Sequence, residues 1–521
     1  MEADLRAAAW PFMRARVARL AIPLVTFTTI AIALVVRGRR ALTLVDFPLN
    51  DGGLFYTIID DLRRAGYALP QTLSYNHAGI PFAYPPLAFY LAAGVRDALG
   101  LSTADVLRLL PVVLSTLVVV AYLPLARALS RNAIAAAIAT FVVAVQPSAY
   151  TWQVMGGGLT RALALLFATL ALVALHSFYT RGSRVALAAT ALFASLTLLS
   201  HIEFAWFLVF SGPLFLLFHA RDRRAALRGS LVIGAAVFFL TAPWWIMVLT
   251  RYGVGPLIAA ATTGSLSNGI LDLLKFERTD EPFFPLVAAT AILGVVVCLL
   301  RRDYFAPAWL VAIGVLDQRS FNVLSALPIG LMAGIVATEV LMPLARDRRT
   351  LIAVAGLAAL YATVSSGRAN QELHRALKPD ERVAMTWVRD HSPADARILA
   401  IAERFWAGDR VTEWLPALSD RTVVDVVQGY EWFPRERGFW KRLEAYDLAQ
   451  QCGGRDAACV EAWANLYGSF DYVYLPKTIG GYWGDGTPIW CCTPLRASLR
   501  ADPRYAVVYD GEGATIFKRA P

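Results

Sequence analysis

Apolar runs separated by short arginine-rich segments follow one another from residue 17 to residue 366. A run of about 17 to 25 apolar residues is long enough to cross a bilayer as a helix. We therefore expect an α-helical polytopic membrane protein with about eleven spans. The predicted spans lie near residues 17–36, 105–126, 132–150, 160–179, 185–200, 203–219, 229–250, 284–300, 304–316, 321–343 and 350–366.

The composition excludes an ordinary soluble enzyme. Hydrophobic residues make up 57% of the chain and charged residues only 17%, which is more apolar than a soluble globular protein of this length. The formal net charge of +10 does not indicate nucleic acid, because the arginines are spread between the apolar runs and form no single basic patch. The expected partner is the lipid bilayer.

The arginine-rich segments predict the orientation, because basic residues are enriched in cytoplasmic loops. Arg14, Arg16 and Arg19 precede the first span and place the N-terminus in the cytoplasm. The first outside loop, 37–104, also carries arginines, but the rule weakens in long loops. An odd number of spans puts the C-terminus outside. Because the first run lacks a small-residue cleavage site, we expect an uncleaved anchor in the plasma (inner) membrane.

The chain changes character after residue 366. Short apolar runs at 397–402 and 471–475 have the length of strands, and helical stretches at 380–390 and 437–451 lie between them. Strands that alternate with helices indicate a small α/β domain. The last segment, 505–518, reads as a β-hairpin. The sequence therefore predicts a transmembrane domain over 1–366 and an extracytoplasmic α/β domain over 367–521.

Cysteine usage agrees with an oxidising compartment for the tail. Cys298 lies inside a predicted span, and the remaining four cysteines follow residue 366. We expect a disulfide between Cys452 and Cys459, while the adjacent Cys491 and Cys492 are not expected to pair with each other. The alternative is four free thiols. A zinc site is disfavoured because no histidine accompanies the four.

Two aromatic segments of the tail have two interpretations. The segments Tyr430–Phe433 and Gly480–Gly486 are rich in tyrosine and tryptophan. Such rings can stack on sugars, and they can equally rest at the membrane interface. The tail contains no nucleophile elbow, phosphate loop or metal-ligand spacing, so the chemistry is expected on the outside face of the helical part.

Asp51 is the leading candidate for that chemistry. It follows the first span and stands between Asn50 and two glycines, which let the backbone approach a ligand closely. An ionisable residue beside the hydrocarbon is costly to hold and indicates function. The alternative is that Asn50–Gly52 is simply a turn and helix cap. Asp60 and Asp61 further along are expected on a solvated face.

His201 and Glu203 are a second candidate pair at an outside turn. Two residues apart, they offer a nitrogen and a carboxylate to a metal ion or an acceptor. The alternative is a hydrogen-bonded pair at a helix turn, because two ligands alone do not make a metal site. With Asp51 they form a tentative set of ligands for Mg²⁺ or Mn²⁺.

The arrangement resembles the GT-C class of polyprenyl-phosphate-dependent glycosyltransferases, which includes protein mannosyltransferases, aminoarabinose transferases and single-subunit oligosaccharyltransferases. An acidic residue follows the first span in that class, as Asp51 does here. The segment Tyr84–Leu87 is similar to the Pro-Pro-Leu run that closes the same loop, and Asp317–Phe321 is similar to the arginine-containing start of a late span. The resemblance covers roughly residues 17 to 345.

The resemblance implies transfer of a sugar from a polyprenyl-phosphate donor to a glycan, lipid or protein acceptor. Asp51 would be the catalytic base or a metal ligand. Arg319 would bind the lipid phosphate, with Arg251 and Arg161 as further candidates, although Arg319 has the alternative of an interface anchor. His77 and Tyr84 of the first loop are expected at the substrate site.

The sequence also departs from that class. Asp51 is followed by Gly52 and not by a second acid, and no Trp-Trp-Asp segment is present in the tail, which disfavours transfer to asparagine. A non-catalytic subunit with the same fold is therefore an alternative. A transporter is a weaker one, because the spans carry few acids and show no internal repeat.

Overall fold

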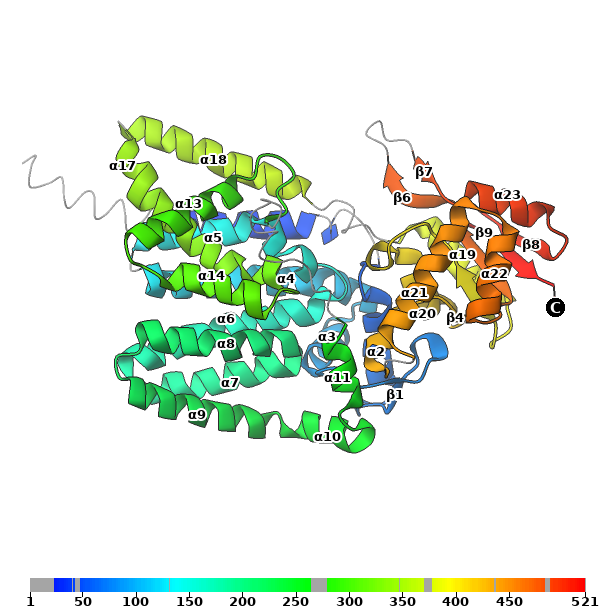
Figure 1. Cartoon of the computed structure of the whole chain (residues 1–521), viewed down its shortest axis with the longest axis horizontal. Helices are drawn as coiled ribbons and strands as arrows, with labels where there is room; N and C mark the ends of the chain where they lie inside the picture. The colour runs from blue at the N-terminus through cyan, green and yellow to red at the C-terminus, as the bar shows by residue number, and fades with distance from the viewer. Residues whose placement is uncertain are drawn as a thin grey trace, which may run out of the picture.

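The computed structural model describes the chain except residues 1–22, 40, 43–46, 131, 264–278, 346, 370–376, 435–436, 483–487 and 521. The basic segment Arg14–Arg19 and Trp483 of the second aromatic segment lie outside the described residues. Two bodies are visible in Figure 1: a stack of long helices, and a smaller domain of strands and helices that holds the C-terminus.

The first body is built from long apolar helices. Among the residues that the structure describes, five helices are long and apolar enough to cross a membrane, or up to seven if each of two bent pairs counts as one span, and three more apolar helices are shorter. The protein is an integral membrane protein. The helices are residues 23–39, α4 (Thr103–Ser130), α5 (Ala133–Val145), α6 (Gly158–Arg181), α7 (Arg184–Ser200), α8 (Ile202–His219), α9 (Arg223–Leu240), α10 (Ala242–Tyr252), α11 (Gly255–Ala261), α13 (Leu286–Leu300), α14 (Phe305–Leu316), α15 (Phe321–Leu324), α16 (Ala326–Val336), α17 (Met342–Leu344) and α18 (Arg348–Arg368).

Side-chain caps fix where several of these helices begin. Asn132, Ser183, Asp222 and Asp347 precede α5, α7, α9 and α18, and each accepts hydrogen bonds from backbone N–H groups of the first turn. A cap of this kind is worth about 1 kcal/mol. These residues stand beside the basic segments, so the turns that separate the apolar runs are also the signals that start the next helix.

The structure differs from the expected spans at two places. The predicted span 132–150 is α5 followed by 3-10 turns bent by 78° from it, and the predicted span 229–250 is α9 and α10, bent by 55°. The first break precedes Pro147, and Pro243 lies in the first turn of α10. Proline lacks the N–H that would continue the preceding helix.

The loop that follows the first predicted span, 37–104, folds against the helical body. It contains α2 (Gly52–Arg64), a short β1–β2 pair (Thr72–Leu73 and Ile80–Pro81), the turn η1 (Tyr75–His77) and α3 (Leu87–Leu99). Asp61 is buried and accepts hydrogen bonds from Ser74 N–H and Oγ, both at 2.7 Å. The prediction of a solvated Asp61 is therefore wrong. Its carboxylate connects α2 to the segment between β1 and η1 through two hydrogen bonds.

The C-terminal domain is a mixed sheet with helices on its faces. Its five strands lie in the order β4-β3-β5-β9-β8, with β3 parallel to both neighbours and β9 antiparallel to β5 and β8. The predicted hairpin at 505–518 is confirmed as β8–β9. The elements are β3 (Arg397–Ala400), β4 (Thr422–Val423), β5 (Tyr472–Pro476), β8 (Tyr505–Asp510), β9 (Ala514–Arg519), the separate pair β6 (Thr478–Tyr482) and β7 (Pro488–Trp490), α19 (Pro379–His391), α20 (Arg410–Ser419), α21 (Phe439–Gln450), α22 (Ala457–Tyr467), α23 (Thr493–Ala501), and the short turns η6 (Trp406–Gly408), η7 (Tyr430–Trp432) and η8 (Gln451–Gly454).

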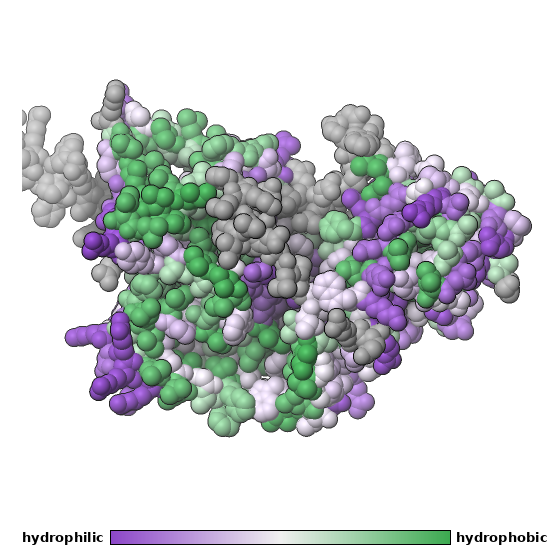
Figure 2. All heavy atoms as spheres, viewed as in Figure 1, coloured by the Kyte–Doolittle hydropathy of each residue, from purple (hydrophilic) through white to green (hydrophobic). Residues whose placement is uncertain are grey.

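The distribution of polar residues follows the two bodies. In Figure 2 apolar residues cover most of the helical body, while hydrophilic residues gather on the C-terminal domain and at the opposite end of the helices. The two bodies share one core, because Leu54 and Phe55 of α2 belong to the same buried cluster as Trp414 of α20 and Tyr474 of β5. The amino-acid composition thus changes near residue 366, but the segments before and after this point share one buried core.

The four tail cysteines lie in two pairs. Cys452 and Cys459 are joined by a disulfide with a Cα–Cα distance of 5.5 Å. Cys491 and Cys492 are also joined to each other, so the expectation that these neighbours cannot pair is wrong. Cys492 has a φ of 56°, and this left-handed turn brings the two sulfur atoms to the same side of the chain. Cys298 is a buried free thiol.

Candidate active site

Asp51 lies at the start of α2 in a turn of unusual backbone conformation. Asn50 and Asp51 have φ angles of 67° and 61°, in the left-handed region that residues other than glycine rarely adopt. Asp51 occupies the N-cap position of α2, but its side chain makes no capping hydrogen bond. The carboxylate instead faces a polar pocket. The interpretation of Asp51 as a helix-capping side chain is therefore not supported.

The capping carboxylate belongs to Glu413, which comes from α20 of the C-terminal domain. Its Oε2 accepts the Asn50 N–H at 2.9 Å and its Oε1 accepts the Gly53 N–H at 3.1 Å. The Gly52 N–H also bonds to it, and the side chain is fully buried. A carboxylate at a helix N-terminus satisfies N–H groups that have no partner within the helix. Glu413 thus holds the turn that presents Asp51.

Two further hydrogen bonds connect the first loop to α20 of the C-terminal domain. The Trp414 indole donates to the Pro48 carbonyl at 3.0 Å, and the Tyr75 hydroxyl donates to the Glu413 carbonyl at 2.7 Å. A Cβ on Gly53 would lie 2.3 Å from that same carbonyl oxygen. Glycine at position 53 therefore allows α20 to pack directly on the first turn of α2.

A run of glycines supports the Asp51 turn from the other side. The Gly156 N–H donates to the Leu49 carbonyl at 2.9 Å, and the Gly157 N–H donates to the Asn50 carbonyl. A Cβ on Gly157 would lie 2.8 Å from Asn50 O and 3.0 Å from Asp51 Oδ2. The segment before α6 must therefore lack side chains for the Asp51 turn to fit against it.

The pocket at Asp51 lies between the helical body and the C-terminal domain and has a volume of about 330 Å³. The helical body contributes Arg161, Glu203 and Arg319, and the C-terminal domain contributes Glu431 and several aromatic rings. The wall consists of Asn50, Asp51, Trp152, Arg161, Glu203, Phe204, Thr263, Arg319, Ser320, Asn322, Val323, Trp406, Ala407, Glu431, Phe439, Trp440 and Leu443.

The charged groups of this pocket have unused bonding capacity. Arg319 Nε lies 3.9 Å from Glu203 Oε2, a distance longer than that of a hydrogen bond. Within the part of the chain that the structure describes, Arg161 Nη1 and Glu203 Oε1 are buried without a hydrogen-bond partner. Buried polar groups without a partner are rare and call for an explanation. Donors and acceptors aimed at one pocket fit a polar ligand.

Burial raises the pKa of three carboxyls at or beside the pocket, those of Asp51, Glu413 and Glu431. Burial raises the pKa of Asp51, and the positive charges of Arg161 and Arg319 oppose this. The Glu431 carboxyl has its pKa raised to about 7 by burial and by the charge of Asp51. The pKa of Glu413 is raised by the same two causes, while the backbone N–H groups that it accepts act in the opposite direction. Carboxyls with raised pKa values suit proton transfer near neutral pH.

Most of the residues predicted for the site lie at or beside this pocket. Asp51, Arg161, Glu203 and Arg319 line it. Tyr84 stands behind the wall, where its hydroxyl lies 3.3 Å from Thr160 Oγ1 and its ring packs on Trp432.

Besides Tyr84, three of the predicted residues do not line the pocket. His201 is buried against Tyr84 and Phe204. His77 Nε2 lies 3.0 Å from Asp420 Oδ1 at an exposed junction, and Arg251 donates to the carbonyls of Leu69 and Pro70. His77 Nε2 and Arg251 Nη1 therefore have partners within the protein, and substrate binding by these two residues stays a prediction.

The tentative metal ligands are not gathered as one set. Among the described residues, the group whose ligand atoms all lie within 4.8 Å of one another is Glu403, Cys491 and Cys492, and the two cysteines are bonded to each other. Asp51, His201 and Glu203 do not form such a group. Asp51 and Glu203 do face the same pocket, and carboxylate oxygens are the ligands that Mg²⁺ and Mn²⁺ prefer.

No family model matches the sequence, and no curated protein matches it. Solved structures do match the fold. The oligosaccharyltransferase AglB from Archaeoglobus fulgidus, in complex with an inhibitory peptide and a dolichol-phosphate, is 14% identical with a TM-score of 0.58, and the match covers 88% of this chain and 70% of that one. A second AglB structure contains Zn and sulfate (13% identical, TM-score 0.53, 87% and 68% covered).

Two further similar structures come from bacteria. ArnT from Cupriavidus metallidurans bound to undecaprenyl phosphate is 14% identical with a TM-score of 0.56, and the match covers 94% of this chain and 97% of that one. The arabinofuranosyltransferase AftD from Mycobacteria is 15% identical with a TM-score of 0.54, over 96% of this chain and 42% of AftD. The chain therefore has the fold of the membrane-embedded GT-C glycosyltransferases.

Proposed function

We propose that this protein is a glycosyltransferase that moves a sugar from a polyprenyl-phosphate donor to an acceptor hydroxyl at the extracytoplasmic face. The observation that carries the proposal is the Asp51 carboxylate, which faces a pocket together with Arg161, Arg319 and Glu203 and is not used as a helix cap. The fold adds support, because the similar AglB and ArnT structures hold dolichol-phosphate and undecaprenyl phosphate.

The proposed reaction needs a base and a group that binds the departing phosphate. The acceptor oxygen attacks the anomeric carbon, the bond from that carbon to the phosphate oxygen breaks, and polyprenyl phosphate leaves with the electron pair. Asp51 takes the proton of the acceptor hydroxyl. Arg319 and Arg161 bind the phosphate, because guanidinium groups donate two parallel hydrogen bonds to its oxygens. Asp51 and the two arginines line one pocket, as this requires.

An apolar groove beside the pocket suits the lipid part of the donor. It has a volume of about 1040 Å³ and lies among α6, α7, α8 and α9. Ile202 lines the groove, while the next residue, Glu203, lines the polar pocket. We propose that the polyprenyl chain lies in this groove, which keeps the lipid within the apolar layer while its phosphate reaches Arg319.

A divalent cation fits the acidic part of the pocket. Asp51 and Glu203 would hold it, and the unpartnered Oε1 of Glu203 is a free oxygen ligand. Such an ion, when bound, neutralises charge on the donor phosphate. Asp51 would then still take the proton of the acceptor hydroxyl through its second oxygen, and the two arginines would keep their role at the phosphate.

The proposed location is the plasma (inner) membrane, with the N-terminus in the cytoplasm and the C-terminal domain outside. The disulfide between Cys452 and Cys459 fits an oxidising compartment. A reporter fused after residue 400 tests this orientation. Activity of a cytoplasmic reporter there would place Asp51 on the wrong side of the membrane and refute the proposed function.

The function itself is tested with a deletion strain and with purified protein. Mass spectrometry of envelope lipids and glycans should show one sugar missing in the strain, with accumulation of the polyprenyl-phosphate donor. Purified protein supplied with that donor should release polyprenyl phosphate only when acceptor is present. Unchanged lipids and glycans in the deletion strain would contradict the proposal.

A further inference from the structure

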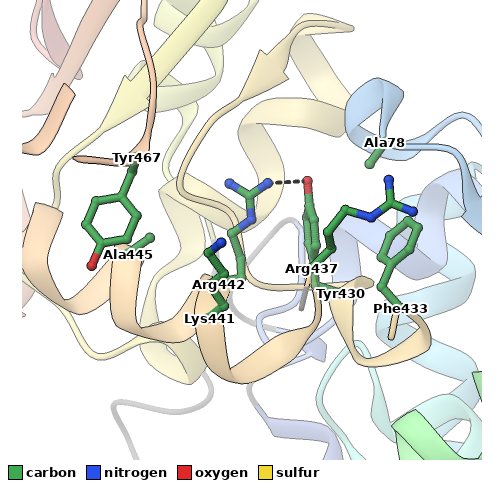
Figure 3. Close-up of a pocket in the computed structure, with 8 residues that line it drawn as sticks. All are labelled: Ala78, Tyr430, Phe433, Arg437, Lys441, Arg442, Ala445 and Tyr467. Atoms are coloured by element: carbon green, nitrogen blue, oxygen red, sulfur yellow. Dashed lines mark hydrogen bonds between the residues drawn. The ribbon is translucent and has the colours of Figure 1, made fainter. Parts of the chain in front are cut away.

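A second polar pocket lies on the C-terminal domain and is lined by three cations. It has a volume of about 340 Å³, and Arg437, Lys441 and Arg442 of the segment that starts α21 project into it. Figure 3 shows these cations beside the rings of Tyr430, Phe433 and Tyr467. The lining is completed by Ala78 and Ala445, and none of the described residues that line it is acidic.

The three cations differ in how they are held. Arg442 is fixed, because it donates to the Val424 carbonyl and, at 2.7 Å, to the Tyr430 hydroxyl. Arg437 and Lys441 are exposed, and neither side chain has a hydrogen bond or ion pair with any described residue. The carboxylate next to the pocket, Glu444, bonds to the Tyr467 hydroxyl. Two cations are thus available to an anion from solution.

A third cavity borders both this basic pocket and the candidate active site. It has a volume of about 480 Å³ and shares Glu431, Phe439 and Trp440 with the pocket at Asp51. It shares Phe433 with the basic pocket. Its wall includes Gly438, the N-cap residue of α21. The three cavities therefore follow one another past the N-terminus of α21, whose dipole favours negative charge.

The geometry of α21 sets a minimum length for a ligand that uses both ends of this path. Trp440 and Leu443 face the pocket at Asp51, whereas Lys441, Arg442 and Ala445 face the basic pocket. At about 100° per residue these two sets lie on opposite sides of one helix. A helix is about 10–12 Å across with its side chains, so a single monosaccharide cannot reach from Asp51 to Lys441.

We propose that the acceptor is an anionic oligosaccharide whose phosphate or carboxylate group binds between Arg437 and Lys441 while its reactive hydroxyl lies at Asp51. This inference rests on the proposed function and adds the class of acceptor. A glycan fits the path better than a peptide, because its walls present the aromatic faces of Phe433, Phe439 and Trp440. Flat apolar faces of this kind pack on sugar rings while polar groups at the edge bind hydroxyls.

Binding is measured on the full-length protein in lipid nanodiscs by fluorescence anisotropy. The labelled probes are tetragalacturonate, maltotetraose with a terminal phosphate monoester, unmodified maltotetraose, and an octapeptide of glutamate. Wild-type protein should bind one or both anionic glycans more tightly than unmodified maltotetraose, and the carboxylate and phosphate arms identify the anion. The double variant Arg437→Gln/Lys441→Gln should weaken that binding roughly tenfold or more, as expected for loss of two charge-assisted contacts.

The control variant is Lys518→Gln, which removes an exposed cation from β9 of the same domain and should change nothing. Equal binding of charged and neutral glycans, or full affinity in the double variant, would overturn the proposal. Octapeptide binding as tight as glycan binding, with the same loss in the double variant, would also overturn it in favour of an acidic peptide. Binding needs no turnover, so anionic probe binding without any sugar transfer would support the site and refute the proposed function.

Discussion

Replacing Glu413 should impair catalysis without touching any group in the pocket. Its carboxylate accepts the N–H groups of Asn50 and Gly53 at 2.9 and 3.1 Å from a fully buried position. Glutamine has one oxygen and one NH₂, so Glu413→Gln loses at least one charge-assisted hydrogen bond. Each such bond contributes about 1.5–3 kcal/mol. The Asn50–Asp51 turn then loses part of the support for its left-handed backbone, and Asp51 moves.

The expected result is a fall in kcat larger than the loss of stability explains. A displacement of about 1 Å at a reacting group lowers the rate by on the order of 10²-fold. Michaelis kinetics with a purified polyprenyl-phosphate sugar should therefore show kcat reduced by about that factor, with a much smaller change in the KM for the donor, because Arg319 and the lipid groove are unaffected. Thermal unfolding should show that the free energy of unfolding of Glu413→Gln is lower than that of the wild type by about a few kcal/mol at most.

The matched control is Glu381→Gln. Glu381 is equally buried in the C-terminal domain, and its carboxylate binds Arg410 Nε at 2.8 Å and the Lys378 N–H at 2.9 Å, in place of the N–H groups of Asn50 and Gly53. Its replacement should lower stability by a comparable or larger amount, since a broken buried ion pair costs about 3–5 kcal/mol, and should leave kcat near the wild-type value. A Glu413→Gln variant with wild-type kcat, or equal losses of kcat in the two variants, would refute a positioning role for Glu413.

Three further expectations concern other groups of the site. Arg319→Gln should lower kcat/KM for the donor by roughly 10- to 100-fold, the value of a lost phosphate contact, measured by initial rates. The pKa of Glu431 is raised from 4.5 to about 7, so its contribution to stability is complete below pH 4.5 and is lost as the pH rises to about 7. The unfolding free energy of wild type relative to Glu431→Gln should fall across that window. Gly157→Ala should reduce turnover, because its Cβ would lie 3.0 Å from Asp51 Oδ2, whereas Gly94→Ala, with open space around its Cβ, should not.

The sequence predicts those parts of the site that local patterns indicate. Asp51 stands out because a carboxylate with two glycines directly follows an apolar run, and Arg161, Glu203 and Arg319 stand out because they are charges at the ends of such runs. The fold class follows from the same apolar runs. These signals are short-range, so no knowledge of the packing is needed to recognise them.

The parts that the sequence does not predict come from contacts across the chain. Glu413 binds a backbone N–H 363 residues away, and within α20 nothing distinguishes it from a solvated acid on an amphipathic helix. Glu431 lies in a segment noted only for its aromatic residues. The Gly156–Gly158 run looks like an ordinary turn, and only its close approach to Asp51 explains it. The sequence signal that could have identified this segment is that three consecutive glycines directly precede an apolar span.

Residue type and loop position do not reveal which partners a polar side chain has in the fold. His77 and Arg251 have the residue types and the loop positions expected of ligands for a phosphate or an acceptor. In the structure, His77 Nε2 lies within hydrogen-bond distance of Asp420, and Arg251 Nη1 donates to the Leu69 carbonyl. Whether a polar side chain is free for a substrate depends on its partners in three dimensions, and sequence spacing does not contain that information.

The most direct measurement is sugar transfer from a polyprenyl-phosphate donor by Asp51→Asn, with Asp60→Asn as the control. Asparagine keeps the size of the side chain and tolerates the left-handed backbone at position 51, so thermal stability should be unchanged. Loss of the base or metal ligand should lower the rate by on the order of 10²-fold or more. Asp60, which accepts a hydrogen bond from Thr103 at 2.7 Å, should tolerate the same change with activity retained. A rate of sugar transfer by Asp51→Asn equal to that of the wild type would contradict a catalytic role for Asp51.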